Sequence, residues 1–95
     1  MRKSEYLSLM NFPSEWLEWD LYPDELFRGQ MAHYKAGDEA GSEHDRNGAF
    51  HWWLRRKPSL DVLQKLLLLT YIDGDSIMAA DARRYIENAI KRTRP

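Results

Sequence analysis

The stretch PSLDVLQKLLLLTY, residues 58–71, decides the fold class of this chain. Its apolar residues recur at spacings of three and four, which is typical of one face of an α-helix. These residues are Leu60, Leu63, Leu66, Leu67 and Tyr71. Leu68 and Leu69 add a second apolar face, so we expect this helix to be central in the fold. Pro58 ends the preceding helix, and Ser59 can cap the first backbone N–H groups of this one.

Proline, glycine and serine divide the rest of the chain into further helical segments. Helices are expected over residues 4–10, 13–21, 23–36, 45–56 and about 76–92, with Ser4 as the first cap and Gly37 as the stop of the third. Residues 37–44 read as a loop and 73–76 as a tight turn. No segment alternates apolar and polar residues convincingly, so strands are not needed. We predict an all-α fold, an irregular or orthogonal bundle of four to six short helices, in a single domain spanning residues 1–95.

The helical spacing also predicts which side chains face inward on the other helices. They are Tyr6, Leu7, Met10, Trp16, Leu17, Leu21, Leu26, Phe27, Gln30, Met31, Tyr34, Phe50, Trp53, Leu54, Met78, Ala82, Tyr85, Ile86 and Ala89. The tryptophans have two interpretations: they fill a small core between short helices, or they anchor a protein partner, since interfaces are enriched in Trp.

The composition favours a cytoplasmic protein. The chain has no cysteine, which excludes disulfides, thiolate metal sites and cysteine nucleophiles. The charged N-terminus leads into no apolar signal segment, and the longest purely apolar run, residues 66–69, is far short of the roughly 20 residues that span a bilayer. We therefore expect no membrane association.

Charge is divided unequally along the chain, although the net charge is only −1. Residues 1–45 carry ten acidic and four basic side chains, whereas residues 46–95 carry five acidic and ten basic ones. One interpretation is a charged surface for a partner. The other is internal pairing of the acids with basic residues of the second half, namely Arg55, Arg56, Arg83 and Arg84.

No catalytic, metal or nucleotide signature is present in the sequence. His44 and His51 are seven residues apart, which separates them by about 10 Å along a helix, too far for one zinc ion. We expect no enzyme activity, no cofactor and no metal.

Two basic clusters, at residues 55–57 and 91–94, leave nucleic-acid binding as an alternative. The sequence pI of about 6.3 argues against an autonomous binder, because these usually have a pI above about 9. Basic residues near helix ends also have a simpler role, since they complement the negative end of the helix dipole.

Residues 59–90 resemble one HEAT-type helical hairpin: a leucine-rich helix, an Asp-x-Asp turn, and then Met78, Ala82 and Ile86. The position where HEAT sequences often carry an arginine after the second aspartate holds Met or Ala here. The resemblance implies two antiparallel helices.

In size, acidic first half and surplus of aromatic residues, the chain resembles the small immunity proteins that neutralise bacterial toxins. That resemblance implies a small protein-binding module that inhibits a cognate toxin domain with a basic surface. The predicted partner-binding residues are Glu15, Trp16, Glu18, Trp19, Asp20, Asp38, Glu39, Glu43 and Asp45. The alternative is a small regulatory or nucleic-acid-associated protein that acts through its basic C-terminal half.

Overall fold

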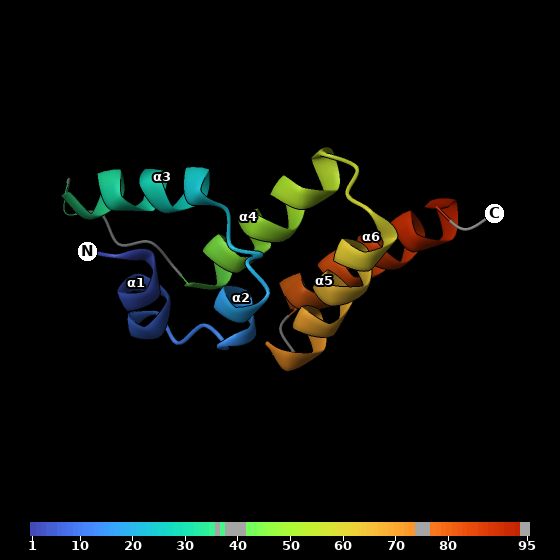
Figure 1. The fold of residues 1–95 in the computed structure, drawn as a ribbon, viewed down its shortest axis with the longest axis horizontal. Helices are drawn as coiled ribbons and strands as arrows, with labels where there is room; N and C mark the ends of the chain where they lie inside the picture. The colour runs from blue at the N-terminus through green and yellow to red at the C-terminus, as the bar shows by residue number, and fades with distance from the viewer. Residues whose placement is uncertain (36, 38–41, 74–76, 94–95) are drawn as a thin grey trace. The chain divides into compact units, whose positions relative to one another are not determined.

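The structure is a computed structural model that describes residues 1–35, 37, 42–73 and 77–93, with the backbone alone at 42–44 and 77–78. Six α-helices and no strand occur in this part of the chain, and it is 78% helical (Figure 1). The helices are α1 (Lys3–Leu9), α2 (Glu15–Glu18), α3 (Asp24–Lys35), α4 (Ser42–Arg55), α5 (Leu60–Ile72) and α6 (Ile77–Thr93). The predicted all-α class and helix number are confirmed.

The chain divides into two compact units, Met1–Ala49 and Phe50–Pro95, and the division falls inside α4. We call them unit 1 and unit 2. The interpretation of residues 1–95 as a single domain stays a prediction. The border between the units nearly coincides with the position at which the chain changes from mostly acidic to mostly basic. Unit 1 holds ten acidic and five basic residues, and unit 2 holds five acidic and nine basic residues.

Two left-handed residues shape unit 1. Asn11 and Asp20 have φ angles of 58° and 54° and follow the ends of α1 and α2. After each of them the chain turns back, with N–H bonds from Phe12 to the Leu7 carbonyl and from Leu21 to the Trp16 carbonyl. This is the Schellman arrangement, in which the residue after the turn packs on the last helical turn. It ends α2 at Glu18, so the predicted helix through residue 21 is too long.

An aromatic core fills unit 1. Tyr6, Trp16 and Tyr22 have at most 1% of their surface exposed, and Phe12 has 8%. The Phe12 ring lies 5.8 Å from Trp16 and 5.4 Å from Tyr22 in edge-to-face contacts, which aromatic pairs favour. Leu17, predicted to face inward with Trp16, is 44% exposed, because α2 is a single turn that can bury only one side.

Helix α3 packs less deeply than its sequence pattern predicts. It contains no buried residue, and its apolar stripe is half-buried at Leu26, Phe27 and Met31. Tyr34, at the end of that stripe, is 41% exposed. Gly37 is the stop of helix α3, as predicted. The Gly37 N–H donates to the Tyr34 carbonyl, and the glycine has a φ angle of 79°.

Unit 2 is built on the α5–α6 hairpin. The two helices pack side by side and run in opposite directions (Figure 1), the geometry that the HEAT-type resemblance implies for this segment. Ser59 caps α5 by accepting the N–H of Val62, as predicted. The inner faces carry fully buried side chains, namely Leu63, Leu66, Leu69 and Thr70 on α5 and Ala82 and Ile86 on α6.

Two tyrosines predicted for the inside of unit 2 are instead at its surface. Tyr71 is 58% exposed and Tyr85 is 54% exposed. The guanidinium of Arg83 lies 3.9 Å from the Tyr71 ring centroid and donates to the hydroxyl and carbonyl oxygens of Thr70 at 3.2 and 3.1 Å. None of the described helices is long and apolar enough to cross a membrane.

Candidate protein-binding surface

Five carboxylates occur close together in the chain, on α2, on the segment after it and on the first turn of α3. We call this set the acidic surface; it consists of Glu15, Glu18, Asp20, Asp24 and Glu25. Burial of Trp16 fixes the side of α2 that faces the core. Glu18 is therefore exposed, and Glu15 is half-buried at the edge of the same turn. Carboxylates in a first helical turn also suit the positive end of the helix dipole, which explains their concentration at Asp24 and Glu25.

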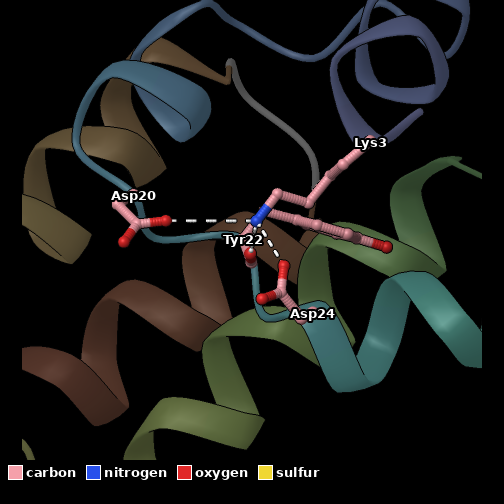
Figure 2. Close-up of polar contacts among 4 residues, drawn as sticks. All are labelled: Lys3, Asp20, Tyr22 and Asp24. Atoms are coloured by element: carbon pink, nitrogen blue, oxygen red, sulfur yellow. Dashed lines mark hydrogen bonds and ion pairs between the residues drawn. The ribbon is translucent and has the colours of Figure 1, made fainter.

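One lysine organises the connector between α2 and α3. Figure 2 shows the ammonium of Lys3 between Asp20 and Asp24, close to the backbone of Tyr22. Its Nζ donates to Asp24 Oδ1 at 2.7 Å and to the Tyr22 carbonyl at 3.0 Å, and it lies 4.0 Å from Asp20 Oδ1. These contacts lower the pKa of Asp24, chiefly through the hydrogen bond from Lys3. The lysine side chain is only 20% exposed, whereas the two carboxylate side chains are 93% and 75% exposed.

Two acids of α2 keep their charge uncompensated. Within the described residues, neither Glu15 nor Glu18 forms an ion pair. Leu17, which directly precedes Glu18 in the chain, is 44% exposed, and Trp19 directly follows Glu18 and is half-buried. The single turn of α2 therefore offers exposed apolar area and unpaired carboxylates, the two components that a binding surface combines in an apolar centre and a polar rim.

The predicted partner-binding residues separate into groups. Glu15, Glu18, Trp19 and Asp20 lie together on α2 and the turn after it, with at least part of each side chain accessible. Asp38 and Glu39 lie outside the described residues. Glu43 belongs to α4, but its side chain is not among those described.

Trp16 and Asp45 are not on a surface, so their assignment to partner binding is wrong. Trp16 has no exposed area because it packs on Phe12 and Tyr22. Asp45 is 4% exposed. Sequence reasoning counts every acid of a charged half as solvated, which fails when buried donors satisfy the carboxylate.

The donors around Asp45 are tyrosines from distant parts of unit 1. The Tyr6 hydroxyl donates to Oδ2 at 2.6 Å, and the Tyr22 hydroxyl lies 2.8 Å from the same oxygen. The Gln30 amide adds a longer bond of 3.4 Å to Oδ1. Burial raises the pKa of Asp45, and the hydrogen bonds from Tyr6 and Tyr22 oppose that rise. Burial and the neighbouring carboxylate also raise the pKa values of both tyrosines.

Sequence reasoning missed this cluster and the role of Lys3. The partners of Asp45 are 39 and 23 residues away, and no local spacing encodes such a pairing. Lys3 is likewise 21 residues from Asp24. The signal that was available is compositional: an aromatic core that includes tyrosines needs acceptors for their hydroxyls.

Unit 2 contains a basic groove between the end of α4 and the outer side of α6. Its volume is about 510 Å³, and its walls are His51, Leu54 and Arg55 on α4 and Tyr85, Asn88 and Arg92 on α6. Other arginines of this unit are engaged locally. Arg84 bonds to Asp81 at 2.6 Å, and Arg56 lies 3.7 Å from the Trp52 ring centroid.

No group of three or more histidines and acids among the described residues could hold a metal ion. Comparisons of the chain with protein-family models, with curated proteins and with solved structures find no match.

Proposed function

We propose that this protein is a small protein-binding module whose acidic surface docks on a basic surface of a partner protein. The observation that carries the proposal is that α2 exposes Leu17 together with Glu15 and Glu18, two acids that form no ion pair within the described residues. Apolar area supplies affinity when it is desolvated, while the surrounding charge steers the encounter and selects a partner of opposite sign.

The Schellman turn at Asp20 and the contacts of Lys3 support the proposal because they make this surface rigid. They fix the connector between α2 and α3 before any partner arrives. A surface ordered in advance loses less conformational entropy on binding. A toxin domain with a basic surface is the partner that the resemblance to immunity proteins implies, and the chain would then act as an inhibitor of that toxin.

The test compares the wild-type chain with E15K/E18K, which reverses the two unpaired charges. Its matched control is D61K/E87K, which makes the same change of net charge on exposed acids of unit 2. All three proteins are used to capture partners from a lysate of the native host, and captured proteins are quantified by mass spectrometry. We expect a basic protein that wild type and D61K/E87K retain and that E15K/E18K loses.

Kinetics then decide whether that protein binds in the proposed way. Charge reversal at the rim should lower its association rate by about tenfold or more at low salt, and less at high salt. The melting temperatures of the variants should stay close to that of wild type, since exposed charges contribute little to stability. If E15K/E18K and D61K/E87K lose the captured protein equally, or if only D61K/E87K loses it, the acidic surface is not the binding site. If the captured protein arrests growth and co-expression of this chain relieves the arrest, the inhibitor reading is supported.

The second candidate function, association with nucleic acid through the basic half, is favoured by one observation. Arg55 and Arg92 line the groove of unit 2, and neither guanidinium group makes a hydrogen bond or ion pair within the described residues. Phosphates are the natural partners of such guanidinium groups.

A further inference from the structure

We propose that the groove of unit 2 is a binding site for a nucleotide, either free or as part of a single strand. This site is independent of the acidic surface, since all of its lining residues belong to unit 2. The volume of about 510 Å³ is within the range of small-molecule sites, roughly 300–1,000 Å³.

The charge of the groove selects an anion. Arg55 and Arg92 come from different helices and contribute two permanent positive charges. Both stand in the last turns of α4 and α6, where each helix end contributes a charge of about −0.5. The helix dipoles therefore offset part of this positive charge, and the two guanidinium groups supply the remaining attraction for an anion.

The aromatic and apolar lining residues select a planar ring. The Tyr85 and His51 rings lie 5.7 Å apart in an edge-to-face contact, and Tyr85 is still 54% exposed. An exposed aromatic face of this kind can stack on a base, which contributes about 1–3 kcal/mol per base in single-strand binding. Leu54 adds an apolar wall.

Helical spacing places these chemistries in order along α6. Tyr85, Asn88 and Arg92 follow one another at spacings of three and four residues, so they form one stripe on the helix. On α4, Leu54 and Arg55 lie three and four residues after His51, so both neighbour it on that helix. A base stacked at Tyr85 would then have the Asn88 amide, both a donor and an acceptor, beside its edge, and its phosphate would extend toward Arg92. Nucleotides combine a planar base, polar edges and a phosphate in this order.

The experiment measures binding of adenosine 5′-monophosphate to the full chain by calorimetry. The variants R55A and R92A should each weaken binding by about tenfold, the usual loss for a hydrogen bond to a charged group. The matched control R84A removes an exposed arginine of α6 that pairs with Asp81 and does not line the groove, and it should bind as wild type does. Y85A should lower the affinity for the mononucleotide but leave the affinity for ribose 5-phosphate, which has no base, unchanged.

Two further probes separate the sources of the nucleotide. Tighter binding of an oligothymidylate than of the mononucleotide, with a steep salt dependence, would identify a single strand as the ligand. Equal affinities would identify a free nucleotide. The proposal fails if the mononucleotide does not bind at millimolar concentration, or if R84A weakens binding as much as R92A. Neither result would affect the acidic surface, which E15K/E18K tests separately.

Discussion

At the scale of single residues, the buried carboxylate of Asp45 has an electrostatic consequence for unit 1. Two tyrosine hydroxyls and one amide surround it, and it is 4% exposed. A buried carboxylate costs free energy when ionised, even when hydrogen bonds offset part of that cost. The residue therefore couples the stability of unit 1 to pH.

We predict that Asp45 makes the protein relatively more stable in acid. Its pKa in the folded chain is raised above the ordinary 3.8, so the folded state holds a proton that the unfolded chain has already lost. This contribution is complete below pH 3.8 and is lost as the pH rises through the folded pKa. The melting temperatures of wild type and D45N should therefore be compared from pH 3.5 to 7. As the pH falls, the melting temperature of wild type should rise relative to that of D45N.

The comparison with D45N isolates this one group. Asp24 and Glu5 have lowered pKa values and change stability in the opposite sense, but both are present in the two proteins and cancel in the difference. A difference in melting temperature that does not vary with pH would show that Asp45 titrates alike in the folded and unfolded chains.

At the scale of elements, a helix end could be predicted from the sequence when the interactions that set it are between residues close together in the chain. Caps and stops at Ser59 and Gly37 act within a few residues, and the sequence is sufficient to predict them. Asn11 and Asp20 adopt left-handed conformations that many other asparagines and aspartates do not, so the early end of α2 could not be predicted.

The candidate site was predictable only in part for the same reason. The acids of α2 are close in sequence and share a surface, whereas Asp45 is removed from it by tyrosines far along the chain. Helical spacing identifies an apolar stripe, but it does not say how much of the stripe a neighbour covers. This is why Tyr71 and Tyr85 are exposed, contrary to expectation.

The leucines of α5 provide a graded test of that element. Leu66 is fully buried, Leu67 is half-buried and Leu68 is 53% exposed. L66A should lower the free energy of unfolding by roughly 2–5 kcal/mol, because it leaves a cavity in the hairpin. L67A should cost clearly less than L66A, and L68A should stay within about 0.5 kcal/mol of wild type. Urea denaturation measures all three, and an equal loss in L66A and L68A would show that the inner face of α5 has been misassigned.

At the scale of the whole molecule, an acidic unit and a basic unit share one helix. Because α4 runs unbroken across the border between Ala49 and Phe50, melting either half of it removes hydrogen bonds from the other. We predict that the two units unfold in one cooperative transition, as the single-domain interpretation requires.

Tryptophans distributed over both units make this measurable. Trp16 and Trp19 belong to unit 1, and Trp52 and Trp53 belong to unit 2. In protein labelled with 5-fluorotryptophan, fluorine NMR should give the same urea midpoint for all four signals. L66A, a change in unit 2, should lower every midpoint equally. If only the signals of Trp52 and Trp53 shift, the chain consists of two domains that unfold independently.

The shared helix also bears on how such a protein can change over generations. A break between residues 49 and 50 would leave eight helical residues on one fragment and six on the other, both below the length of about 12–15 at which an isolated helix holds. Genetic recombination at the border would therefore exchange half a helix together with a whole surface. The acidic surface and the basic groove are accordingly expected to be inherited as a pair, and new combinations of them would arise by point substitution rather than by shuffling of gene segments.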